Sequence, residues 1–130
     1  MRAISVVTVL LMVTLSAAVR PAAPDTLEVL GQAGVLGEWE LTAKIMTTDD
    51  GKRKVFSGPL VMKHVGLCTQ DGPEIKQGEL QLQMLSLSRV RATLVVAGVT
   101  CTYAGRKSDA YNGVMRCPDQ RAVPLLLWLK

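Results

Sequence analysis

Three cysteines, Cys68, Cys101 and Cys117, are the side chains of this sequence with the most reactive chemistry. In an oxidising compartment an odd number predicts one disulfide bridge and one remaining thiol. The sequence holds neither a C-x-x-C pair nor a cluster of cysteine and histidine at metal-ligand spacing, so we expect no zinc or other metal site. The cysteines are therefore expected to be structural.

The sequence around the last two cysteines predicts a hairpin that brings them together. If Gly105 lies opposite Gly113, Cys101 falls opposite Cys117. Directly opposed positions place Cβ atoms within bridging distance. We therefore expect a Cys101–Cys117 disulfide and a free Cys68; the alternative is a bridge from Cys68 to either partner, which would pin the loop beside it.

Acid–base chemistry has few candidates. His64 is the single histidine, and no nucleophile lies near it in a catalytic sequence context. Paired carboxylates occur at Glu38 and Glu40, on the outer face of a predicted strand, and at Asp49 and Asp50, at a predicted turn. Neither pair has the enclosure that general acid–base work requires. With no glycine-rich phosphate loop either, we expect no catalytic residue, no cofactor and no enzymatic activity.

Strands with alternating apolar and polar residues must position these side chains. In 38–46 every second residue is apolar, which is typical of a half-buried strand. The Asp50-Gly51 pair predicts a two-residue type I′ turn. That turn would pair Ile45 with Phe56 on the inner face of the sheet.

The rest of the chain continues in the same manner, with short links between strands. About seven strands with almost no helix predict an all-β fold: a small antiparallel up-and-down β-barrel of seven to eight strands, with a β-sandwich as the alternative. We favour the barrel because closure pairs the apolar last strand with the first. A bulge is expected near Ser86 and a loop at 70–78. The further strands are predicted at 54–65, 79–87, 90–96, 99–105, 111–117 and 122–129.

The inner face of this barrel carries mostly leucine, methionine and valine, with few aromatic rings. An interior of this size is either filled by side chains or holds one small ligand. The candidates for the barrel interior and for contact with a ligand are Trp39, Leu41, Phe56, Leu60, Met62, Leu82, Met84 and Leu94.

The first 18 residues have the layout of a secretory signal peptide. Arg2 precedes an apolar run at 4–15, and small residues follow at a suitable cleavage position. The run is too short to span a bilayer as a helix. We therefore expect residues 1–18 to be a signal peptide, the working protein to begin near Val19, and its location to be secreted or periplasmic without a membrane anchor.

The remaining chain suffices for one domain. Residues 19–36 begin rich in proline and alanine and are expected to form a flexible lead with a short helical turn, followed by the barrel domain at 37–130. The formal net charge is +4, and the charges are interspersed. Because no lysine or arginine stripe is present, we expect no nucleic-acid partner.

Gly37-Glu38-Trp39 resembles the G-x-W signature of calycin barrels such as lipocalins and avidins. The segment 36–41 is also similar to the opening of bacterial inhibitors of secreted metalloproteases. The resemblance implies an eight-stranded barrel, and in those inhibitors the N-terminal segment enters the protease cleft. Gly37 and Trp39 match residue by residue, and the resemblance implies that Trp39 closes one end of the barrel.

These observations predict a secreted or periplasmic binding protein without catalytic activity. In one interpretation the barrel is solid and its surface binds an extracytoplasmic protein, as an inhibitor of a secreted protease or other hydrolase does. In the alternative, the barrel carries a small apolar ligand, or the protein has a purely structural role. The volume of any cavity in the barrel distinguishes the first two interpretations.

Overall fold

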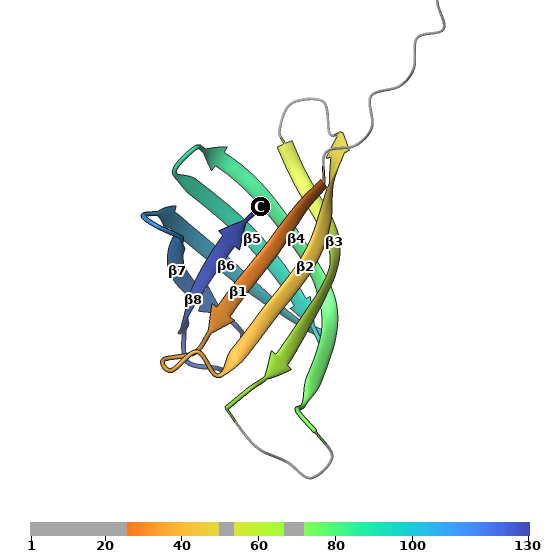
Figure 1. The fold of residues 1–130 in the computed structure, drawn as a ribbon, viewed down its shortest axis with the longest axis vertical. Helices are drawn as coiled ribbons and strands as arrows, with labels where there is room; N and C mark the ends of the chain where they lie inside the picture. Colours follow the sequence, from red (N-terminus) through yellow and green to blue (C-terminus); the bar gives the residue numbers. More distant parts are fainter. Residues whose placement is uncertain (1–25, 50–53, 67–71) are drawn as a thin grey trace, which may run out of the picture.

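The computed structural model describes residues 26–49, 54–66 and 72–130. Within them the chain forms a closed barrel in which each strand pairs antiparallel with its sequence neighbours and β8 pairs with β1 (Figure 1). The predicted all-β up-and-down barrel is therefore confirmed. The strands are β1 (Thr26–Ala33), β2 (Trp39–Asp49), β3 (Lys54–His64), β4 (Ile75–Ser86), β5 (Arg89–Val96), β6 (Val99–Lys107), β7 (Tyr111–Arg116) and β8 (Val123–Leu129).

The described residues contain no helix long and apolar enough to cross a membrane. The predicted signal peptide at 1–18, the Asp50-Gly51 turn and Cys68 lie outside the part of the chain that the structure describes.

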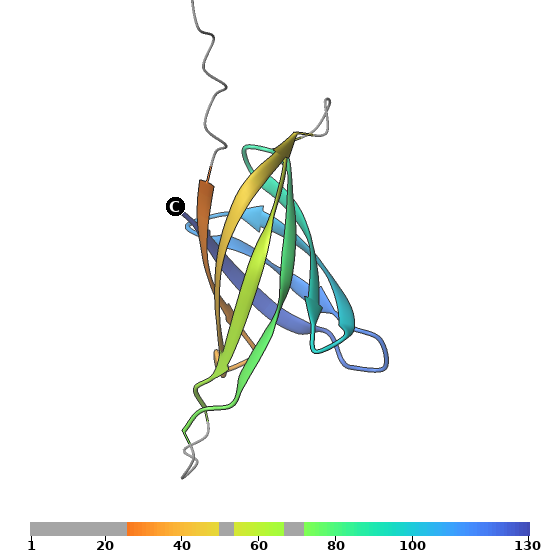
Figure 2. The same ribbon diagram turned by 90° about the vertical axis from the view of Figure 1, so that its right-hand side faces the viewer.

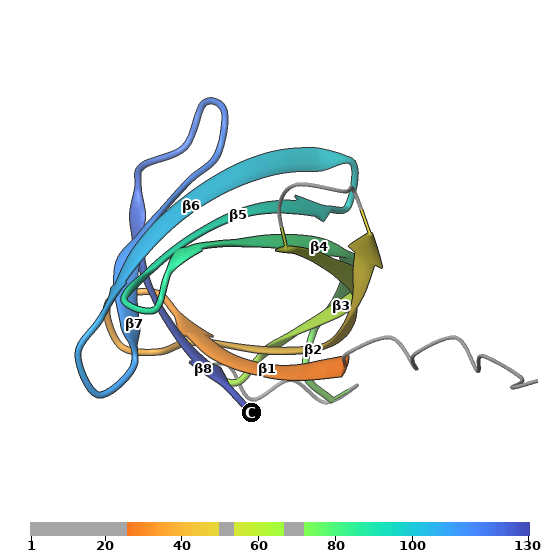
Figure 3. The same cartoon turned by 90° about the horizontal axis from the view of Figure 1, so that it is seen from above.

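The strands run at a tilt along the long axis (Figure 2), and from above they enclose a ring (Figure 3). Side chains on a strand point alternately to its two faces, so every second residue enters the ring. Most of those residues are apolar, and the buried ones form one continuous core. The core residues that are at most 1% exposed are Val29, Ala33, Leu41, Ile45, Leu60, Leu80, Leu82, Val90, Leu94, Leu125 and Leu127.

The first strand corrects the expectation of a flexible lead with a helical turn at 19–36 for residues 26–36, and residues 19–25 lie outside the part of the chain that the structure describes. Thr26–Ala33 is β1, which pairs with β2 on one side and β8 on the other, and Val29 is fully buried. Gly31, which breaks the run of larger residues in this segment, lies in the barrel wall: a Cβ there would lie 2.8 Å from Leu127 Cδ2. Close packing against β8 explains this strand glycine, and the barrel begins before residue 37.

The β2–β3 register differs by two residues from the predicted one. A two-residue turn at Asp50-Gly51 would pair Ile45 with Phe56, whereas the structure pairs Thr47 with Phe56. The connection between the two strands is longer than two residues. Because side chains alternate with period two, a shift of two leaves the inner face unchanged, and Phe56 is buried as expected.

Two other predicted features of the ladder are confirmed. Gly105 lies opposite Gly113 in the β6–β7 hairpin. The β4–β5 register shifts between Met84 and Ser86, where a bulge was expected. The predicted loop at 70–78 is wrong in its last part, because β4 already begins at Ile75.

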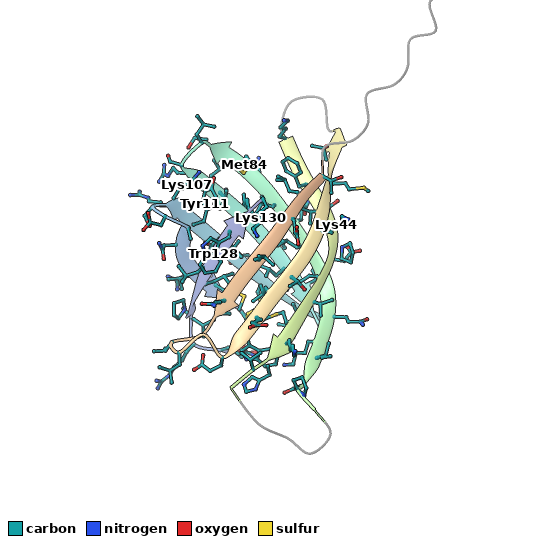
Figure 4. The ribbon with its side chains drawn as sticks, in the orientation of Figure 1. Lys44, Met84, Lys107, Tyr111, Trp128 and Lys130 are labelled. Carbon is teal, nitrogen blue, oxygen red and sulfur yellow. A yellow bond between two sulfur atoms is a disulfide. The ribbon has the colours of Figure 1, made fainter. Side chains whose placement is uncertain are left out.

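A pair of buried tyrosines, Tyr103 and Tyr111, links strands β6 and β7 to the β4–β5 turn by hydrogen bonds. Tyr103, on β6, is 2% exposed, and its hydroxyl donates a hydrogen bond to the Tyr111 carbonyl oxygen at 3.1 Å. The hydroxyl of Tyr111, labelled in Figure 4, donates to the Leu87 carbonyl oxygen at 3.2 Å. A Cβ on Gly105 would lie 2.7 Å from the Tyr103 Cζ, and a Cβ on Gly113 would collide with the Ala104 carbonyl oxygen and lie 2.8 Å from the Tyr103 ring, so both glycines leave room for this ring. Burial raises the pKa of Tyr103 to about 12.

We predict that alkaline pH destabilises the barrel through Tyr103. In the unfolded chain a tyrosine ionises near pH 10, whereas the folded protein keeps the Tyr103 proton until about pH 12. The stabilisation from the neutral phenol is therefore complete below about pH 10 and is lost as the pH rises toward 12. Thermal melts across this range should show the loss.

Tyr103→Phe is the matched variant. At neutral pH it should unfold more easily by about 1 kcal/mol, because the hydrogen bond to Tyr111 is lost. Its melting temperature should then fall less steeply between about pH 10 and 12. Equal alkaline slopes for the two proteins would contradict the assignment to Tyr103.

Candidate functional site

The eight predicted interior residues all belong to one packed core. Six are buried, and Trp39 and Met84 are partly buried and pack against them. They lie at different levels of the barrel: Trp39 and Met62 at one end, Phe56 and Met84 toward the other. The six buried residues are Leu41, Phe56, Leu60, Met62, Leu82 and Leu94.

A hollow of about 210 Å³ lies at the end of the barrel where β1 and β3 finish, the lower end in Figure 1. We call this hollow the Trp39 mouth. Its walls come from segments far apart in the sequence that strand pairing brings together. Its lining residues are Ala33, Gly34, Trp39, Met62, Lys76, Val96, Ala97, Val99, Cys101, Met115, Cys117, Gln120 and Val123.

Two cross-strand pairs set the positions of the side chains around the indole. Trp39 lies opposite His64 in the β2–β3 ladder, and Met62 lies opposite Lys76 in the β3–β4 ladder. The His64 ring meets the Trp39 ring edge-on, with 4.5 Å between centroids. The Lys76 Nζ lies over the indole, 5.0 Å from its centroid. This is the geometry of a cation–π contact.

His64 ends β3 at the same end of the barrel as Trp39. Its backbone N–H donates to the Glu74 carbonyl oxygen at 2.9 Å. Its Nδ1 atom is buried and makes no hydrogen bond to any residue that the structure describes. No nucleophile was expected beside it, and its contact is with Trp39.

The Cys101–Cys117 disulfide forms part of the wall of the Trp39 mouth. It joins β6 to the residue that follows β7, with 4.3 Å between the Cα atoms. The predicted pairing is confirmed, and it follows from the Gly105–Gly113 register. Such bridges are typical of oxidising compartments.

Glu38 and Glu40, the first pair of carboxylates considered for acid–base chemistry, do not line the Trp39 mouth. Glu40 is exposed on the outer wall, and Glu38 accepts a hydrogen bond from the Leu36 N–H at 3.4 Å. Glu38 therefore folds back onto the β1–β2 loop. Among the described residues, no group of three or more histidine, cysteine, aspartate or glutamate side chains could hold a metal ion.

Sequence reasoning found Trp39 and Met62 in this site and missed Lys76. Lys76 fell in the expected loop, because Gly78 and the polar residues around it obscure the strand pattern. Gly78 is a strand residue at which a Cβ would collide with the Val95 carbonyl oxygen. The signal that could have found Lys76 is its place in the alternation: Lys76, Gly78 and Leu80 are successive inward positions of β4.

No protein-family model and no curated protein sequence matches the chain. The closed barrel of eight antiparallel strands is consistent with a calycin-like fold. The agreement with the G-x-W resemblance is therefore one of architecture.

The disulfide gives a first test of this end of the barrel. Replacing Cys101 and Cys117 together by alanine should lower the free energy of unfolding by about 3 kcal/mol, because the bridge closes a 16-residue separation. Denaturant titration measures the loss. Cys68→Ala is the control and should unfold like the parent and keep the Cys101–Cys117 peptide. In non-reducing peptide mapping of the parent, a bridged peptide containing Cys68 would contradict the pairing.

Proposed function

We propose that this protein is an extracytoplasmic binding protein without catalytic activity, and that it holds a small, mainly apolar ligand in the Trp39 mouth. The observation that carries the proposal is the hollow itself, whose described lining is apolar except for Lys76 and Gln120. Small-molecule sites are concave and mostly apolar, with a few polar groups that fix the orientation of the ligand. The signal-peptide pattern at 1–18 and the disulfide support the location.

The size of the hollow limits the ligand. Sites for drug-sized molecules usually occupy about 300–1,000 Å³, and the Trp39 mouth offers about 210 Å³. Behind it the barrel is filled: Leu41, Leu60 and Leu94 are at most 1% exposed. The proposal therefore places a single ring or a short chain at the end of the barrel rather than along its axis.

A pair of valines tests the proposal. Val99 lines the Trp39 mouth, whereas Val95 lies on β5 outside it, and the two are 37% and 40% exposed. Val99→Phe should fill the hollow and weaken binding of a small neutral probe such as benzyl alcohol at least about tenfold, by loss of space and overpacking. Val95→Phe should bind like the parent.

Amide chemical-shift titration gives the measurement, because it also locates the probe. In the parent protein the shifts should concentrate at Ala97, Met115 and their neighbours in the mouth. Shifts that spread over the outer wall, or equal binding by the two valine variants, would reject the site.

The β1–β2 loop supports a second candidate function, contact with a protein partner. Val35 and Leu36 are 82% and 86% exposed at its tip. The tip is held by a hydrogen bond from the Gly37 N–H to the Gly34 carbonyl oxygen at 3.2 Å, and both glycines have positive φ. An exposed apolar tip with a fixed backbone suits insertion into a partner's pocket, because less conformational entropy is lost on binding.

This candidate is tested on secreted metalloproteases, the class of partner that the resemblance of segment 36–41 to bacterial inhibitors implies. The protein should inhibit at least one member of a broad panel, and Leu36→Asp should weaken that inhibition at least about tenfold by placing a charge in the apolar contact. Leu87→Asp is the control, since Leu87 is 90% exposed at the opposite end of the barrel. Absence of inhibition across the panel would reject the candidate.

A further inference from the structure

We infer that the ligand of the Trp39 mouth is an anion: a carboxylate carried on a single ring or a short apolar chain. The inference rests on the proposed function and adds the charge of the ligand to it. It is carried by the position of one ammonium group in an apolar wall.

Lys76 is the single ionisable side chain among the described residues that line the mouth. It occupies an inward position of β4, in phase with the buried Leu80 and Leu82 and opposite the buried Met62. A lysine at such a position can lay its apolar stem along the barrel wall and keep its ammonium at the rim. The hollow therefore has one positive charge beside an otherwise mainly apolar lining.

The ammonium is also accessible to a ligand. Its side chain is 41% exposed, and its Nζ lies over the Trp39 indole, which fixes it at the edge of the hollow. An ammonium has three donors, and the indole face uses none of them in a conventional hydrogen bond. The edge of the hollow therefore offers a ligand both the flat indole ring of Trp39 and the positive charge of Lys76.

Glu74 is the charged group that competes for this ammonium. Its Oε1 lies 3.9 Å from the Lys76 Nζ, and its side chain is 59% exposed. Ion pairs of this exposure contribute little to stability because water screens them. Glu74 does not line the mouth, so a ligand carboxylate inside the hollow would meet Lys76 from the apolar side, where screening is weaker.

The remaining lining residues indicate the chemistry of the ligand's uncharged part. Val96, Val99 and Met115 offer apolar contact, and Gln120 offers an amide at the rim. A ligand with a positive group would face Lys76 without a partner for its charge. The site therefore selects an apolar body with one negative head.

The experiment compares ligands that differ only in charge: benzoate, benzyl alcohol and benzylamine, with hexanoate and hexanol as a second pair. Binding is followed by amide chemical shifts and calorimetry on the full chain. The parent protein should bind each carboxylate at least about tenfold more tightly than the matching alcohol, with benzylamine weakest. The preference should shrink with added salt, because screening weakens the charge interaction.

Three variants assign the preference to Lys76. Lys76→Met keeps the apolar stem and should bring benzoate down to the affinity of benzyl alcohol, which should itself change little. Lys76→Arg should keep the preference. Lys63→Met, on the outward-facing side of β3, is the matched control for loss of one positive charge and should behave like the parent.

The outcomes separate the two proposals. If alcohols and carboxylates bind the mouth equally in the parent, the charge inference is wrong and the small-ligand function stands. A carboxylate preference that survives in Lys76→Met also overturns the inference. If no member of the set binds at the mouth, both the inference and the proposed function fail. Melting curves of each variant confirm that the barrel is intact.

Discussion

The pairing of β1 with β8 is the contact on which the rest of the barrel depends. Backbone hydrogen bonds join Glu28 and Lys130 in both directions, at 3.1 and 2.9 Å, and the Gly34 N–H donates to the Pro124 carbonyl oxygen at 3.0 Å. This seam gives a partner to β8, a strand with apolar residues on both faces, and it removes the exposed edges that invite aggregation. Once the ring is closed, every second residue must enter a narrow interior, which apolar side chains fill.

The inner and outer faces of the barrel could be predicted from the sequence because period-two alternation is a local property. It placed Leu41, Leu60 and Leu94 inside even though the β2–β3 register was wrong, since a shift of two residues conserves the face. The hairpin that carries the disulfide was predictable for the same reason: Gly105 and Gly113 fix a short local register. Alternation predicts the face of the sheet on which a residue lies, and a tight hairpin predicts its cross-strand partner.

The elements that were missed depend on contacts between distant segments. Gly31 and Gly78 interrupt the local pattern of larger residues, and both lie where a neighbouring strand approaches closely, at Leu127 in one case and at Val95 in the other. Only part of the candidate site could be predicted, because the rest also depends on contacts between distant segments. Trp39 and Met62 lie on clearly alternating strands, whereas Lys76 belongs to the obscured start of β4. Its meeting with Trp39 requires two successive strand pairings, neither of which a local pattern specifies.

The up-and-down order of the strands also has a kinetic consequence. Apart from the seam, every strand pair joins sequence neighbours, so the chain can build the sheet hairpin by hairpin at a small cost in loop entropy. The seam joins the two ends of the described chain and carries the largest loop-closure cost. The disulfide lies within 16 residues and spans β6 and the end of β7, so hydrogen bonds and packing alone hold the seam. We therefore expect closure of the ring to be a late step of folding, and separation of β1 from β8 to be an early step of partial opening.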